Sequence, residues 1–157
     1  MIYKTRDFGE REIPDSKVIV FKQPIFGFDD YTRYTLIYDE EIGEQIVWLQ
    51  SLDEPELCFL LFNPSQFESF YKPEITDEDE KLLGTGEYVC WSILSLKEDF
   101  EASTVNLKSP VIINSTTGVA AQIILEQDFP VRHPIMEGEK YYVVVNQKRR
   151  RIFNNRG

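Results

Sequence analysis

The sequence predicts an all-β protein, a mainly antiparallel β-barrel or sandwich with one or two short helices. Eight short runs rich in β-branched and aromatic residues recur along the chain, with turn-forming residues between them. Convincing helix signals occur in one short stretch. The chain has 157 residues, of which 42% are hydrophobic and 13% aromatic, enough to bury one core. We therefore expect a single domain over residues 1–157.

The eight predicted strands cover residues 18–21, 34–38, 46–50, 57–62, 88–96, 111–113, 122–125 and 141–145. Residues 3–8 carry a weaker ninth signal. The run 88–96 alternates between apolar and polar residues, whereas the run 58–62, CFLLF, is apolar throughout. Alternation is typical of a strand with one solvated face, and an all-apolar run is typical of a strand between two layers.

The segment from Trp48 to Pro64, WLQSLDEPELCFLLFNP, predicts a β-hairpin. Its two apolar runs are each short enough for one strand, and the acidic, proline-containing connector between them continues neither. The one predicted helix begins at Thr76, a good N-cap residue, and ends at Gly84. Acidic residues in its first turn suit the positive end of the helix dipole. We expect the tryptophans Trp48 and Trp91 to lie in the core.

The charge distribution limits the classes of partner. The chain has 17 basic and 27 acidic residues, a net charge of −10. Residues 140–157 hold six basic residues and no acidic ones, which leaves 11 against 27 and a net charge of −16 for residues 1–139. This body repels nucleic acids and anionic membranes and attracts basic proteins. We interpret residues 146–157, with Lys148–Arg151 among them, as a flexible, solvated basic tail rather than a nucleic-acid patch.

Catalytic and metal-binding chemistry has little support. The chain has one histidine, two widely separated cysteines and no GxSxG motif, so we expect no enzyme, catalytic residue, cofactor or metal. Cys58 and Cys90 lie inside apolar runs, as buried thiols of a reducing compartment do. The N-terminus lacks the apolar core of a signal peptide, and no run reaches the ~18 apolar residues of a membrane span. We expect a soluble, cytoplasmic protein, with a monomer as the default state.

Three groups of residues are candidates for partner binding, each with a structural alternative. Aromatic side chains between Pro64 and Pro73 either roof part of the core or form an apolar patch. Closely spaced acids either form a solvated helix face or dock a basic protein. An arginine-histidine pair either ends a strand or makes polar contacts. The candidates are Phe67, Phe70, Tyr71, Glu74, Asp77, Glu78, Asp79, Glu80, Arg132 and His133.

Four separated blocks carry a family resemblance. They are GFDDYTRYTLI (27–37), WLQSLDEPELCFLLFNP (48–64), NLKSPVIIN (106–114) and QIILEQDFPVRHPI (122–135). Their order and spacing resemble the flagellar assembly factor family, FliW, over residues 3–135. The resemblance implies a small antiparallel, barrel-like domain that binds cytoplasmic flagellin. It also implies that the protein, when free of flagellin, binds and antagonises the translational repressor CsrA. A chaperone for another exported protein and a small-molecule-binding barrel remain as alternatives.

Overall fold

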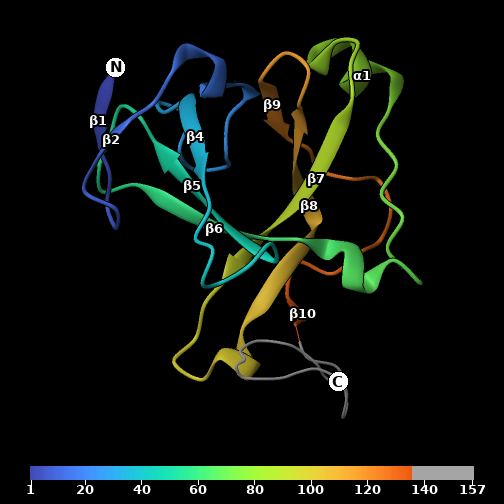
Figure 1. Ribbon diagram of the computed structural model, residues 1–157. Helices are drawn as coiled ribbons and strands as arrows, with labels where there is room; N and C mark the ends of the chain where they lie inside the picture. The colour runs from blue at the N-terminus through green and yellow to red at the C-terminus, as the bar shows by residue number, and fades with distance from the viewer. Residues whose placement is uncertain (136–157) are drawn as a thin grey trace.

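A computed structural model of the protein describes residues 1–135 (Figure 1). Seven strands close into a barrel in the order β8-β7-β6-β5-β4-β3-β9, and β9 returns to pair with β8. Neighbouring strands are antiparallel except β3 and β9, which are parallel. The barrel strands are β3 (Ile19–Gln23), β4 (Arg33–Ile37), β5 (Ile46–Ser51), β6 (Cys58–Phe62), β7 (Tyr88–Ser95), β8 (Thr104–Asn114) and β9 (Val119–Gln122). The predicted all-β fold class is confirmed.

Smaller elements surround the barrel. A two-stranded hairpin, β1 and β2, lies at the N-terminus, and the short strand β10 pairs with the start of β8. One α-helix, α1, and three short 3-10 helices lie in the connections. Their bounds are β1 (Ile2–Lys4), β2 (Glu10–Glu12), β10 (His133–Pro134), α1 (Asp77–Leu83), η1 (Asp15–Lys17), η2 (Pro64–Phe67) and η3 (Phe100–Ala102). None of the helices within residues 1–135 is long and apolar enough to cross a bilayer.

Two apolar clusters form the core. One fills the barrel with side chains from all seven strands, Tyr34 and Val47 among them. The other lies on the outer face of β6, β7 and β8, beneath η2 and α1. Leu61 belongs to the first cluster and its neighbour Phe62 to the second. Because successive side chains of a strand point to opposite faces, β6 lies between two layers, as its all-apolar sequence predicted.

The predicted hairpin and helix are both present. β5 and β6 pair antiparallel from Ile46↔Phe62 to Gln50↔Cys58. Helix α1 begins after Thr76, whose hydroxyl accepts a hydrogen bond from the Asp79 amide (3.1 Å). The Asp79 carboxylate accepts one in return from the Thr76 amide (3.0 Å), so the two residues form a capping box.

Two predicted strands differ from those observed. The run 111–113 is only the end of an eleven-residue strand, β8, which contains Pro110. The β7–β8 register shifts so that Trp91 pairs with Val111 and Ile93 with Asn106, which places Pro110 in an irregular, bulged stretch where its missing N–H is tolerated. The run 122–125 only partly overlaps β9, which begins at Val119 and runs beside β3. The predicted strand 141–145 and the basic tail 146–157 lie outside the described residues.

Candidate partner-binding surface

The three aromatic candidates after β6 have different surroundings. Asn63 caps η2 by accepting a hydrogen bond from the Ser65 amide (3.0 Å). Phe67 and Tyr71 are buried in the outer cluster, whereas 43% of Phe70 is exposed. The Tyr71 hydroxyl donates to the Leu107 carbonyl (2.8 Å). Burial raises the pKa of the Tyr71 phenol, so it stays protonated. The segment therefore covers the outer cluster with the rings of Phe67 and Tyr71 and leaves the Phe70 ring partly exposed to solvent.

His133 joins this segment from the far end of the described chain. Its imidazole ring lies 4.9 Å from the Phe67 ring and 5.3 Å from the Phe70 ring, centroid to centroid. The Gln66 side-chain amide donates to the Ile135 carbonyl (2.7 Å) and ties η2 to the chain after β10. We call Phe67, Phe70 and His133 the aromatic cluster. Arg132, its sequence neighbour, is exposed.

Four of the five acidic candidates are exposed. The carboxylates of Glu74, Asp77, Glu78 and Glu80 face solvent, whereas Asp79 is half-buried in the capping box. The Glu74 amide donates to the Gln127 side-chain carbonyl (2.8 Å), which ties the segment before α1 to the loop after β9. The first turn of α1 therefore holds several negative charges on a fixed element.

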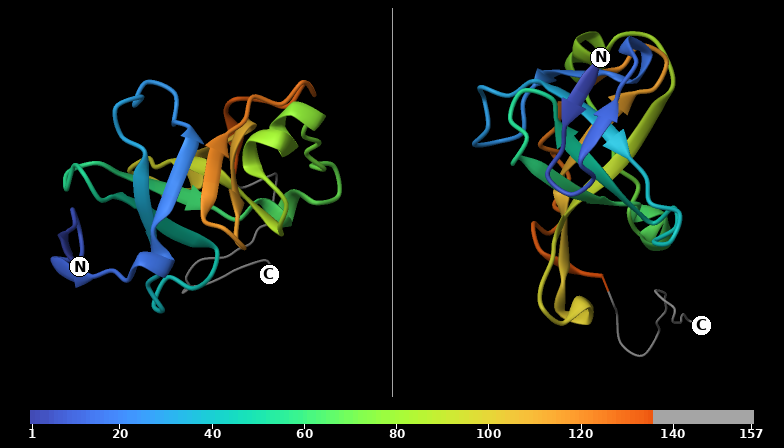
Figure 2. Two further views of the ribbon diagram at one scale, coloured as in Figure 1. Left: turned by 90° about the horizontal axis from the view of Figure 1, so that it is seen from above. Right: turned by 60° about the vertical axis from the view of Figure 1, so that its left-hand side comes forward.

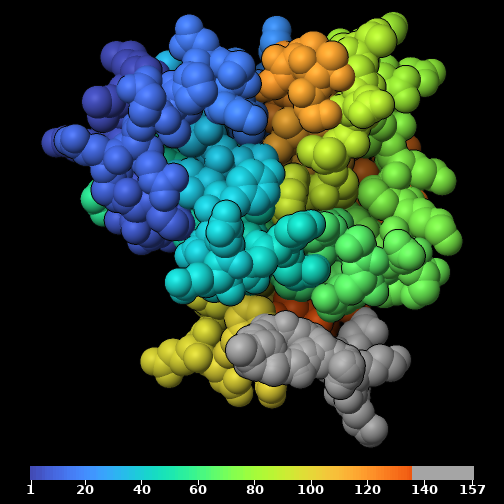
Figure 3. Space-filling model, viewed as in Figure 1, coloured from blue at the N-terminus to red at the C-terminus, as the bar shows by residue number. Residues whose placement is uncertain are grey.

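The acidic helix and the aromatic cluster lie apart. Figure 1 shows α1 at the upper end of the barrel, while η2 and β10 lie toward the lower end. The chain that joins them forms one continuous strip along the side of the molecule (Figure 3, green). The structure thus brings Phe67, Phe70 and His133 together and places the acids of α1 elsewhere on the same side. A partner that touched both would have to follow this strip.

Asn114 holds the C-terminal end of α1, a role that sequence reasoning missed. Its side chain is fully buried and donates to the carbonyls of Leu83 (2.9 Å) and Thr85 (3.1 Å). Its side-chain oxygen accepts from the Thr116 amide (3.0 Å). A Cβ at Gly86 would overlap the Asn114 amide, so glycine is required there. The turn-forming sequence NSTTG at 114–118 was the available signal for this role.

A shallow pocket lies beside this end of α1. Its volume is about 750 Å³, and the Tyr88 hydroxyl on its wall donates to the Gly84 carbonyl. The lining residues are Asp77, Glu80, Lys81, Gly84, Thr85, Gly86 and Tyr88. Across residues 1–135, no group of three or more histidine, cysteine, aspartate or glutamate side chains is arranged to hold a metal ion.

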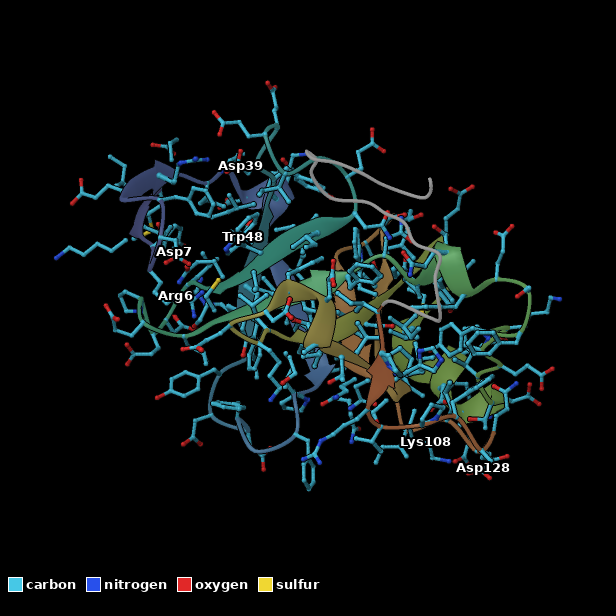
Figure 4. All side chains as sticks on the ribbon, turned by 90° about the horizontal axis from the view of Figure 1, so that it is seen from below. Arg6, Asp7, Asp39, Trp48, Lys108 and Asp128 are labelled. Atoms are coloured by element: carbon cyan, nitrogen blue, oxygen red, sulfur yellow. The ribbon has the colours of Figure 1, made fainter. Side chains whose placement is uncertain are left out.

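The N-terminal hairpin covers Trp48. The Phe8 ring meets the Trp48 indole edge to face at 5.2 Å, so Trp48 is half-buried between the hairpin and the barrel. Arg6 donates from its backbone amide to the Gln50 side chain (3.0 Å) and from its guanidinium to the Cys58 carbonyl (3.2 Å). Figure 4 shows Arg6, Asp7 and Trp48 on this side of the molecule. Core placement was predicted for both tryptophans. It is confirmed for Trp91, which lies inside the barrel, and wrong for Trp48, which belongs to neither core cluster.

Both cysteines are free and half-buried. Burial raises the pKa of the Cys58 and Cys90 thiols to about 11. They are therefore protonated near neutral pH and are poor nucleophiles.

Comparisons with known proteins agree on one family. The model of the FliW protein family matches residues 2–135. The flagellar assembly factor FliW of Lachnoclostridium phytofermentans is 38% identical over 145 residues, covering 87% of this chain and 92% of the relative. That of Lachnospira eligens is 35% identical, covering 87% and 95%. A crystal structure of a flagellar assembly factor FliW superposes with a TM-score of 0.80 at 26% identity, covering 88% of this chain and 99% of that one.

Proposed function

This chain belongs to the FliW family of flagellar assembly factors, and we propose that it binds flagellin and, when free of flagellin, binds and antagonises a CsrA-type translational repressor. Export of flagellin would then release the protein to relieve repression, so flagellin synthesis would follow export. The proposal requires recognition of two proteins and no catalytic step.

The observation that carries the repressor half of the proposal is the acidic helix α1. Its exposed acids lie on an element that is fixed at both ends, by the capping box at Thr76 and by Asn114 at Leu83. An RNA-binding repressor carries a basic surface, because it must contact phosphates. Opposite charges on two such surfaces speed association and suppress wrong partners.

The aromatic cluster, which lies apart from these charges on the same side of the molecule, supports apolar contact with a partner. Phe70 is exposed on one side, while Phe67 and His133 hold its ring on the other. An aromatic side chain that is already held in place loses little conformational freedom when a partner covers it. Such residues contribute more binding energy than their number suggests.

Isothermal titration calorimetry tests the proposal. The purified protein should bind monomeric flagellin and a CsrA-type repressor from the same bacterium at micromolar concentrations. Flagellin should also restore the repressor's binding to its leader RNA when all three proteins and RNA are mixed. If calorimetry detects neither complex, the proposed function is wrong. If both complexes form but flagellin leaves the antagonism of the repressor unchanged, the two binding activities are confirmed. The proposed exchange of one partner for the other is then wrong.

A further inference from the structure

Six residues without regular secondary structure lead from the aromatic cluster to the acidic helix. We call residues 71–76 the linking segment; they belong to no helix or strand. In the described part of the chain, the backbone groups of residues 72–75 form hydrogen bonds only with the side chain of Gln127. The Glu74 amide donates to its oxygen (2.8 Å), and its nitrogen donates to the Lys72 carbonyl (3.0 Å). Gln127 therefore pairs with the linking segment as the main chain of a neighbouring strand would.

The barrel in turn fixes Gln127, which lies in the loop after β9. Lys108 of β8 donates from its amine to the Gln127 carbonyl (2.7 Å) and accepts at its own carbonyl from the Leu125 amide (2.9 Å). Leu125 is buried in the outer cluster. Figure 1 and Figure 2 (left) both show this loop, in orange, beside the green chain that leads to α1. Gln127 thus ties the linking segment to a strand of the barrel.

Apolar packing also holds the linking segment. The Phe129 ring meets the Tyr71 ring edge to face at 4.7 Å, and Ile75 packs against the outer cluster. Such contacts are not directional, so they hold the segment against the barrel without orienting its peptide groups. The two hydrogen bonds of Gln127 supply that orientation. They therefore set the direction in which the chain enters α1 at Thr76.

The position of α1 depends on what holds its two ends. The helix has only seven residues, too few to be stable without tertiary contacts. Asn114 holds its C-terminal end. The capping box holds the first turn together, but both of its residues lie within that turn. Gln127 orients the chain that enters this turn, next to the exposed acids Asp77 and Glu78.

We propose that Gln127 is a positioning residue for repressor binding, an inference that rests on the proposed function. It acts through the linking segment, by holding the exposed acids at the start of α1 in the arrangement that a basic surface meets. A surface already held in its bound arrangement loses less conformational entropy on binding. Gln127 is uncharged, so its loss leaves the electrostatic attraction of the surface unchanged. We therefore expect it to govern how long the complex lasts and not how fast it forms.

Stopped-flow kinetics of Gln127→Ala with the CsrA-type repressor test this inference. The dissociation rate should rise about tenfold, because binding must then also order backbone that Gln127 held, and ordering one residue costs about that factor. The association rate and its salt dependence should match the wild type. Native-state hydrogen exchange should show that the Glu74 amide, which donates to Gln127, loses its protection.

Gln45→Ala is the matched control. Gln45 is also half-buried, and its side-chain nitrogen donates to the Asn63 carbonyl (2.8 Å) before η2, outside the linking segment. The Asn63 amide keeps its bond to the Gln45 backbone carbonyl (2.8 Å) in this variant. Both variants should lower the melting temperature by similar amounts, because each loses a half-buried glutamine side chain that is hydrogen-bonded to the backbone. Only Gln127→Ala should alter the dissociation of the repressor.

Each other outcome overturns the inference. Unchanged dissociation in Gln127→Ala, while the wild type binds, contradicts the inference and leaves the proposed function standing. Equal acceleration in both variants would mean that a general effect of losing a glutamine side chain, rather than positioning, speeds dissociation. Retained protection of the Glu74 amide would show that Gln127 does not hold the linking segment. Failure of the wild type to bind the repressor would overturn the proposed function and this inference together.

Discussion

Asn114 shows how much one side chain can organise. It satisfies carbonyl groups at the end of α1 and amide groups in the turn before β9, and it is fully buried. Removing its amide would leave several buried backbone groups without partners, and each such group costs about 1 to 3 kcal/mol. The residue therefore links the position of the acidic helix to the integrity of the barrel.

Asn114→Ala should lower the free energy of unfolding by about 2 to 4 kcal/mol, because more than one backbone group loses its partner. Urea denaturation followed by tryptophan fluorescence measures this change. The control is Ser115→Ala, which removes an exposed hydroxyl bonded to the Glu87 carbonyl and should cost less than about 0.5 kcal/mol. Equal losses in the two variants would contradict the role assigned to Asn114.

The two thiols predict a loss of stability at alkaline pH. Burial raises the pKa of Cys58 and Cys90 to about 11 in the folded protein, above the ordinary thiol pKa of about 8.5 in the unfolded chain. The unfolded chain therefore releases these protons first, and the free energy of unfolding should fall as pH rises from about 9 to 11. Urea titrations at several pH values should show a smaller fall in Cys90→Ala than in the wild type. If the free energy of unfolding depends on pH identically in Cys90→Ala and the wild type, the buried Cys90 thiol does not contribute to the loss of stability.

At the scale of the element, α1 combines a structural cap with a charged surface. Asp79 belongs to the capping box, whereas Asp77, Glu78 and Glu80 are exposed. The two roles are therefore separable by mutation. Asp79→Ala alone should cost about 1 kcal/mol of stability, since it removes half of the capping box.

Replacing Asp77, Glu78 and Glu80 with serine should slow association with the repressor and flatten the salt dependence of the association rate. Exposed charges at an interface act mainly on encounter, and salt screens them. Stopped-flow measurements across a salt series test this expectation. Flagellin binding, which we expect to depend more on apolar contact, should change less.

The matched control replaces Glu40, Glu41 and Glu44 with serine. These residues are also exposed, and their loss changes the net charge by the same amount, but they lie in the loop between β4 and β5. Equal slowing by both triple variants would mean that net charge alone guides the encounter. Unaltered rates in the α1 variant would show that this helix is only a solvated surface.

At the scale of the molecule, the net charge of −10 predicts a negative result. The acidic body repels phosphates, so direct binding of leader RNA at physiological salt should be undetectable. Removing residues 148–157 should not change this result. A salt-sensitive shift in an electrophoretic assay that disappears on removing them would show that the basic tail binds RNA.

The sequence by itself determined the features that depend on near neighbours. The strand runs, the β5–β6 hairpin and the Thr76 cap each involve residues a few positions apart, so periodicity and turn chemistry were enough to predict them. The predicted strand boundaries were wrong where pairing with a neighbouring strand determines how far a strand extends. β8 continues through Pro110 because the pairing with β7 is irregular there, and β9 is defined by its parallel pairing with β3.

Only the tertiary structure decided which side chains are buried and which are exposed on the surface. It buried Phe67 and Tyr71, left Phe70 exposed and brought His133 onto its ring from the other end of the domain. No local pattern distinguishes three aromatic residues within five positions, because burial depends on which distant element covers each one. The same reason applies to Gln122 and Phe26, whose hydrogen bond joins β9 to the loop between β3 and β4 only once the barrel has closed.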